Sequence, residues 1–181
     1  MMKMTTQNLS TKSVLSNQII NLKKQKNKII SEKNTQIEFL VTENNKLNNT
    51  LSTIEAQINQ KNIQIDVINK ALSGGEPPSS VIGNETTESS QLYKNDYNNT
   101  INETAKILGV TPKEITNSEG HINLTDSEKI TLSIELQKNK TQVSSLENQK
   151  SELTYDITVN DNNVIKTTII TDQIINKYYK K

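Results

Sequence analysis

Hydrophobic residues recur along residues 15–72 at alternating steps of three and four positions. From residue 30 onward this row is almost entirely Ile and Leu, while most positions between are Asn, Gln, Lys, Glu, Thr or Ser. Such steps form the seam of a coiled coil, because a slightly under-wound helix keeps the row facing its partner. We therefore expect a first long arm that buries one narrow stripe, the first seam, against another helix. The first seam comprises Ile30, Ile37, Leu40, Asn44, Leu47, Leu51, Ile54, Ile58, Ile65, Ile68 and Leu72.

Three polar residues, Lys33, Asn44 and Lys61, stand in this row. A seam lysine can pack its aliphatic stem while its amine reaches water. A lone seam asparagine usually fixes the register and the number of partners at some cost in stability. We interpret all three as structural residues.

The N-terminal end follows a different register. Residues 1–13 are mostly polar, so residues 1–14 are expected to be frayed, and the spacing then restarts at Leu15, Ile19, Leu22, Lys26 and Ile29. Joining this register to the first seam requires a four-residue insertion, a stutter, which locally unwinds a supercoil. Doublets such as Ile19-Ile20 widen the apolar face there, so we expect self-association through surface that one partner helix cannot cover.

A second arm is expected over residues 125–181. Thr125 to Glu128 has the sequence of a capping box, which marks a helix start. The second seam comprises Leu132, Leu136, Val143, Leu146, Leu153 and Ile157. Alternating Thr and Val about an Asn/Asp turn would also fit a β-hairpin near residues 154–170. The seam spacing continues through this stretch, which favours the helix.

Between the arms lie a linker, residues 73–90, and a small helical tip, residues 91–124. Two glycines and two prolines end the first arm decisively. A short amphipathic helix follows and stops at Gly109, and a second capping box at Thr111 to Glu114 opens a shorter helix. The tip residues expected to pack together or to contact a partner are Tyr93, Tyr97, Ile101, Leu108 and Ile115.

The two arms are nearly equal in length, which favours an antiparallel helical hairpin whose end is the tip. The fold class is therefore all-α. The rival arrangement is a parallel homo-oligomer in which both arms of each chain lie end to end.

Composition supports extended helices over a broad core. Only 31% of residues are apolar, with one Phe and no Trp among 181 residues. The net charge is +1 and every one of the 21 basic residues is lysine, so neither a global field nor an arginine fork is present to bind nucleic acid. The absence of Cys excludes disulfides and thiolate chemistry. No signal peptide or membrane-spanning run is apparent, so we expect a soluble protein without a membrane partner, in a compartment that the sequence leaves open.

No constellation of reactive side chains stands out. His121 is the single histidine, and Glu119 and Asp126 beside it are a poor metal-ligand set. The Gly74-Gly75 pair is not followed by the Lys and Ser or Thr of a phosphate-binding loop. We expect no catalytic residue, no cofactor and no metal, and hence no enzyme.

Residues 104–115 resemble the core of a helix-turn-helix motif. Ala105 stands four residues before the turn residue Gly109, and Ile115 stands six after it. The resemblance implies DNA binding through the second helix, but that helix stops by Gly120 and contains no arginine. The same joint serves small helical hairpins that never contact DNA, so a protein is favoured over DNA as the partner of the tip.

These observations predict a non-enzymatic structural coiled-coil protein: a spacer, fibre or clamp in a larger assembly, such as a phage virion. The alternatives are an oligomeric binding module whose helical tip grips a protein partner, and a scaffold or chaperone that leaves the finished assembly. The expected partners are further copies of this chain and other proteins of the assembly.

Overall fold

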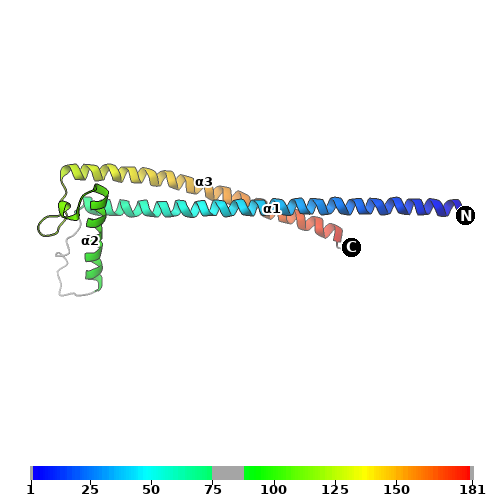
Figure 1. Cartoon of the computed structure of the whole chain (residues 1–181), viewed down its shortest axis with the longest axis horizontal. Coiled ribbons are helices and arrows are strands. Elements are labelled where there is room, and N and C mark those ends of the chain that lie inside the picture. The colour runs from blue at the N-terminus through cyan, green and yellow to red at the C-terminus, as the bar shows by residue number, and fades with distance from the viewer. Residues whose placement is uncertain (1, 75–87, 180–181) are drawn as a thin grey trace. The chain divides into compact units, whose positions relative to one another are not determined.

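A computed structural model describes residues 2–74 and 88–179 (Figure 1). The elements in chain order are helix α1 (Met2–Leu72), helix α2 (Glu88–Leu108), the 3-10 helix η2 (Pro112–Ile115) and helix α3 (Asp126–Tyr179). Within the described ranges there is no β-strand, and a single isolated bridge joins Thr116 and Ile122. The predicted all-α fold class is confirmed.

The chain divides into two compact units, which we describe separately. The tip unit is Ser52–Ser151, and the arm unit combines Met1–Leu51 with Glu152–Lys181. Both α1 and α3 contribute residues to each unit.

In the tip unit, α1 and α3 pack closely and run antiparallel. Ile68 and Ala71 of α1 share a buried cluster with Leu132 of α3, while Glu55 pairs with Lys150 across a 3.4 Å N–O distance. Residue numbers thus rise along α1 as their partners' numbers fall along α3. Within this unit α1 and α3 therefore pair as the predicted helical hairpin and do not lie end to end.

In the arm unit, α3 remains helical through residues 154–170, so the alternative of a β-hairpin there is wrong. Threonine hydroxyls in this stretch donate to carbonyls one turn earlier: Thr158 to Thr154 O at 2.9 Å and Thr171 to Thr167 O at 2.8 Å. Such bonds satisfy the hydroxyls of β-branched residues inside a helix. Thr167 and Thr171 are also buried, so packing adds to these local bonds.

Several boundaries differ from the sequence-based expectation. Helix α1 begins at Met2, so residues expected to be frayed before Leu15 are helical, and α2 begins at Glu88 rather than at Gln91. No glycine or proline lies in either extension to stop a helix that has already formed. The helix expected after Thr111 is only the four-residue turn η2.

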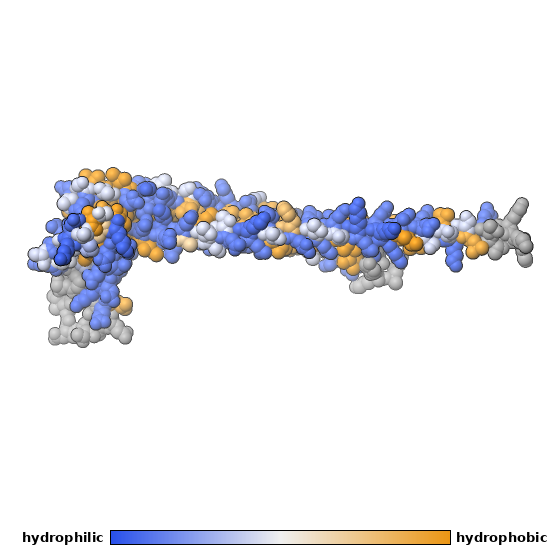
Figure 2. Space-filling model, viewed as in Figure 1, coloured by the Kyte–Doolittle hydropathy of each residue, from blue (hydrophilic) through white to orange (hydrophobic). Residues whose placement is uncertain are grey.

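Polar residues dominate the visible surface of both long helices, with apolar residues interspersed among them (Figure 2). Large apolar side chains are exposed on α1 and α3 as well as buried between them. The two helices therefore keep apolar surface that their mutual contact does not cover.

Candidate functional site

A small apolar core holds the tip together. Tyr97, Ile101 and Ala105 project from one face of α2 and enclose Ile115, which is the last residue of η2 and is fully buried. Half-buried residues close the cluster from α2 and from the loops on either side of η2. These are Leu108, Val110, Ile122 and Leu124.

Side-chain hydrogen bonds of two residues, Tyr97 and Asn117, fix the loop after η2. The hydroxyl oxygen of Tyr97 accepts the N–H of Ile122 at 2.9 Å, which ties the loop to α2. The side-chain oxygen of Asn117 accepts the N–H groups of Glu119 and His121, both at 3.0 Å. The loop closed by the Thr116–Ile122 bridge is thus held by side-chain bonds within it, at Asn117, and at its end, at Ile122.

The hydrogen bonds around η2 and α3 explain where each begins. The N–H of Thr111 donates to Glu114 Oε2 at 3.1 Å, and the N–H of Thr125 donates to Glu128 Oε1 at 2.9 Å. The hydroxyl of Thr125 also accepts the N–H of Glu128 at 3.2 Å, which completes a reciprocal capping box.

An ion pair formed by a lysine of α1 connects α1 to α2. Lys70 Nζ lies 3.0 Å from Asp66 on its own helix and 3.1 Å from Asp96 on α2. The hydrogen bonds that the Lys70 ammonium donates to Asp66 and, second in effect, to Asp96 raise the pKa of Lys70 above its ordinary value. The side chains are partly exposed, so the contribution to stability is small.

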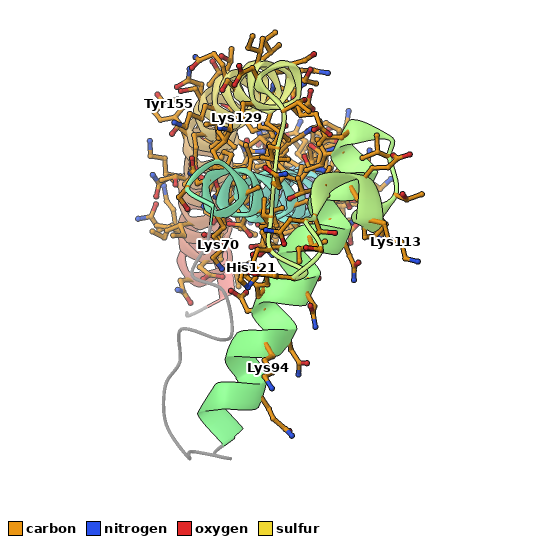
Figure 3. The ribbon with its side chains drawn as sticks, turned by 90° about the vertical axis from the view of Figure 1, so that its left-hand side faces the viewer. Lys70, Lys94, Lys113, His121, Lys129 and Tyr155 are labelled. Carbon is orange, nitrogen blue, oxygen red and sulfur yellow. The ribbon has the colours of Figure 1, made fainter. Side chains whose placement is uncertain are left out.

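The predicted tip residues are largely interior. Tyr97, Ile101 and Ile115 are buried together and Leu108 is half-buried against them, so their main contacts are with one another. The side chain of Tyr93 lies outside the described residues. Leu92, by contrast, is exposed, and Figure 3 shows Lys94 and Lys113 projecting outward from α2 and η2.

The helix-turn-helix resemblance ends at η2. A DNA-reading helix should follow the turn at Gly109, but the structure has four residues of 3-10 helix and then the bridged loop. No recognition helix is formed in the described part of the tip.

Every predicted seam residue is buried or half-buried. On α1 these are Ile30, Ile37, Leu40, Asn44, Leu47, Leu51, Ile54, Ile58, Ile65, Ile68 and Leu72. On α3 they are Leu132, Leu136, Val143, Leu146, Leu153 and Ile157. By contrast, the N-terminal row Leu15, Ile19, Leu22 and Ile29 is exposed, because no described residue of the chain covers it.

Two asparagines are buried along the seams. In the arm unit, Asn44 Nδ2 donates to Asp161 Oδ1 and to the carbonyl of Ile157. In the tip unit, Asn139 is fully buried and neither its Nδ2 nor its Oδ1 has a hydrogen-bond partner. An unpaired buried amide is costly, so Asn139 weakens the helix pair at this position.

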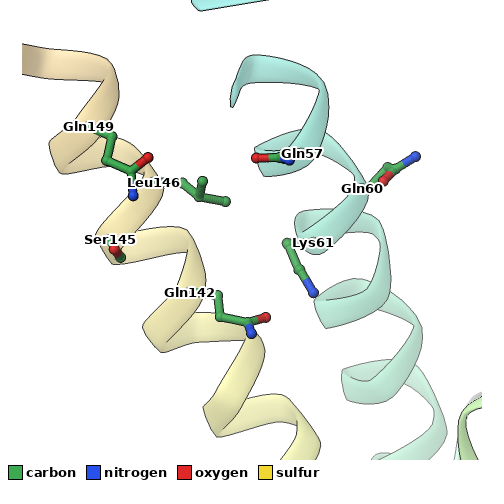
Figure 4. Close-up of a pocket in the computed structure, with 7 residues that line it drawn as sticks. All are labelled: Gln57, Gln60, Lys61, Gln142, Ser145, Leu146 and Gln149. Atoms are coloured by element: carbon green, nitrogen blue, oxygen red, sulfur yellow. The ribbon is translucent and has the colours of Figure 1, made fainter. Parts of the chain in front are cut away.

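A polar groove of about 430 Å³ lies between α1 and α3 in the tip unit (Figure 4). Four glutamine amides line it together with a serine, a leucine and one lysine. The lining residues are Gln57, Gln60, Lys61, Gln142, Ser145, Leu146 and Gln149. These groups suit hydrogen bonding to another polar segment; they do not include a nucleophile paired with a base.

Sequence reasoning missed several contributors to the tip. Thr100 and Thr104 are buried on α2, and Ile122 and Leu124 alternate toward the core after the bridge. The two-residue spacing of Ile122 and Leu124 could have predicted that both side chains lie on one side of an extended segment and so enter the tip core. The buried threonines were not predictable, because nothing local distinguishes them from exposed ones.

Among the described residues, no cluster of three or more His, Cys, Asp or Glu side chains could hold a metal ion. The helices within those ranges also lack a stretch long and apolar enough to cross a bilayer. No protein-family model, curated protein or solved structure matches the chain.

Proposed function

We propose that this chain is a non-enzymatic structural coiled-coil protein, acting as a spacer, fibre or clamp within a larger assembly such as a phage virion. One observation carries the proposal: burial on both long helices follows rows spaced by three and four residues. Most of the chain is therefore committed to helix pairing.

The remaining surface supports an assembly role. Large apolar side chains stay exposed on both long helices, among them Leu22, Phe39 and Tyr155. Single exposed apolar residues are ordinary, but several on one helix offer surface for further helices. The groove lined by glutamines adds hydrogen-bonding groups and no recognisable reaction centre.

The tip favours a second candidate function, that of a binding module. The core of the tip is complete without a partner, while Leu92, Lys94 and Lys113 face outward. Such a unit could grip a partner protein while the long helices only join copies. A scaffold or chaperone that leaves the finished assembly has the same structural requirements.

The deciding experiment asks whether the protein stays in a purified particle. Particles from cells that make the chain are sedimented, washed and probed with an antibody raised against it. A structural component remains at fixed stoichiometry, whereas a scaffold is present only in unfinished particles. Absence from every large particle would contradict the proposal.

A full-length variant tests the second candidate. Leu92→Ser with Lys113→Glu changes the outer tip surface without touching its core. Loss of a co-purifying protein, with particle incorporation unchanged, would favour the binding module. The matched control is Ile63→Ser with Lys129→Glu, which alters exposed residues of α1 and α3.

A further inference from the structure

The contact between α1 and α3 in the tip unit contains two apolar stretches. In the first, Ile68 of α1 and Leu132 of α3 are fully buried in one cluster. In the second, Ile54 and Ile58 of α1 are each only 7% exposed. Burial of apolar side chains is the main force that holds two helices together, so each apolar stretch resists the separation of α1 from α3.

Polar residues interrupt the seams between these stretches. On α1 the interruption is Lys61, and on α3 it is Asn139, each at a position where the steps of three and four residues call for Ile or Leu. Gln142 follows Asn139 by three residues, so the two side chains are neighbours on one side of α3. Gln142 and Lys61 line the same groove. We call Lys61, Asn139 and Gln142 the polar layer.

Three buried atoms of the polar layer have no hydrogen-bond partner in the described part of the chain. They are Nδ2 and Oδ1 of Asn139 and Oε1 of Gln142. Burying a polar atom without a partner is unfavourable, because the atom gives up its hydrogen bonds to water and gains none. The amide of Asn44 in the arm unit donates across the helix pair to Ile157 and Asp161, whereas Asn139 forms no such bond. The polar layer therefore opposes the helix contact in which it lies.

The groove reaches the seam at the same level. Its volume is about 430 Å³, and the apolar part of its lining is Leu146. Figure 4 shows Gln142 and Leu146 projecting from α3 toward α1. None of the described lining residues is an acid that could pair with Lys61. The helices are thus joined by fewer apolar contacts here than in either apolar stretch.

We propose that α1 and α3 separate locally at the polar layer while both apolar stretches stay packed. Local opening has its lowest free energy where few apolar contacts are lost and where the exposed groups gain hydrogen bonds from water. Opening here returns water to the amides of Asn139 and Gln142 and fully hydrates the ammonium of Lys61. The polar layer is therefore an opening point built into the helix pair.

Such an opening point gives the tip unit a joint. The pair can bend at the polar layer without separating Ile68 from Leu132 or exposing Ile54. A helix segment that loses its partner is only marginally stable in water, so its backbone hydrogen bonds also break from time to time. Amide hydrogen exchange therefore reports the opening directly. The inference goes beyond the proposed function, because it concerns the motion of the chain itself.

The first measurement uses the unaltered, full-length chain. Exchange is resolved to single amides by NMR, and residues 60–63 and 139–142 are compared with residues 52–55, 65–68 and 132–136. We expect the amides of the polar layer to exchange about tenfold or more faster than those of the apolar stretches, after correction for intrinsic rates. Equal rates in the layer and in both stretches would overturn the inference.

The second measurement closes the layer. Lys61→Leu with Asn139→Leu replaces its two seam residues with a good helix former that packs in a seam. Exchange at residues 60–63 and 139–142 should slow about tenfold, to the rate of the apolar stretches. A general gain in stability would instead slow the apolar stretches by the same factor and leave the difference unchanged, which would contradict a local opening.

The matched control makes the same two changes one residue further along each helix. Asn62→Leu with Lys140→Leu again replaces one asparagine and one lysine, but both positions are exposed. The fast exchange of the polar layer should persist in this control. All proteins are compared at a concentration at which they sediment with the same mass, because association also protects amides.

A control pair that closed the layer as fully as Lys61→Leu with Asn139→Leu would also overturn the inference. Retention in a purified particle is measured separately. A chain that is absent from particles but exchanges fast at the polar layer would remove the proposed function and leave the opening point. A chain that is retained in particles but exchanges evenly would do the reverse.

Discussion

Truncating Leu132 to alanine tests the packing of α1 against α3 at its best-defined point. Leu132 is fully buried in a cluster with Ile68 and Ala71, and half-buried neighbours from α2 and the loop before α3 close around it. The change removes three carbon atoms from this cluster. At about 0.8 kcal/mol for each buried methylene, the transfer term alone is about 2.4 kcal/mol.

A cavity term adds to that figure. Fully buried Leu→Ala changes generally cost about 2–5 kcal/mol, because neighbours collapse only partly into the space. The cluster joins three segments of the tip unit, so we expect a total loss of about 3–4 kcal/mol in the free energy of unfolding.

The control lies two residues away on the same helix. Ile134 is 65% exposed, so Ile134→Ala should change the free energy of unfolding by less than about 0.5 kcal/mol. Urea denaturation followed by circular dichroism, with equal m-values for all three proteins, gives the comparison. Each titration is repeated at two protein concentrations, because self-association would otherwise add to the apparent stability.

Equal costs at Leu132 and Ile134, or a loss below about 1 kcal/mol at Leu132, would refute the reasoning. Either result would mean that α1 and α3 are not packed through this cluster in solution.

Three further changes give smaller effects. Asn139→Leu should raise the free energy of unfolding by about 1–3 kcal/mol in urea titrations, since it removes an unpaired buried amide, whereas exposed Asn163→Leu should change little. Thr125→Ala removes the cap of α3 and should cost about 1 kcal/mol in thermal and urea unfolding; Ser127→Ala is its control, and equal effects would contradict the capping assignment. Lys70→Met should cost less than about 1 kcal/mol near pH 8. Because the pKa of Lys70 is raised on folding, its stabilisation is present below its ordinary value of 10.5 and is lost as the pH rises through the folded pKa; a pH-independent difference between the two proteins would exclude the ion pair.

The long helices were predictable because their apolar residues recur at regular steps of three and four positions. A row such as Ile54, Ile58 and Ile65 signals one buried face over many turns, and no single residue decides the outcome. The same periodicity through Ile157 outweighed the β-branched composition of residues 154–170. In the structure, threonine hydroxyls bonded to carbonyls one turn earlier resolve that conflict.

The tip was predictable only in outline. The glycine stop and both capping boxes are local patterns, and they mark where α2 ends and where η2 and α3 begin. The bond from Ile122 N–H to the Tyr97 hydroxyl joins residues 25 positions apart, and no local pattern specifies such a pair. The contact of Lys70 with Asp96 is equally non-local.

The start of α1 could not be located from sequence either. Residues before Leu15 are mostly polar and carry no continuous apolar stripe, so nothing there requires a helix. The structure is helical from Met2, since the segment also lacks any residue that ends one.

The order of pairing between α1 and α3 restricts how a lineage could shorten or lengthen this chain. In the tip unit, Glu55 faces Lys150 while Ile68 meets Leu132, so each turn of one helix has an assigned counterpart on the other. A deletion of seven residues shortens a helix by about 10 Å and nearly two full turns, so the remaining seam residues still face the other helix. A deletion of five residues rotates the seam residues beyond the deletion away from the other helix. Viable length variants should therefore differ by whole heptads, deleted or duplicated in both helices together.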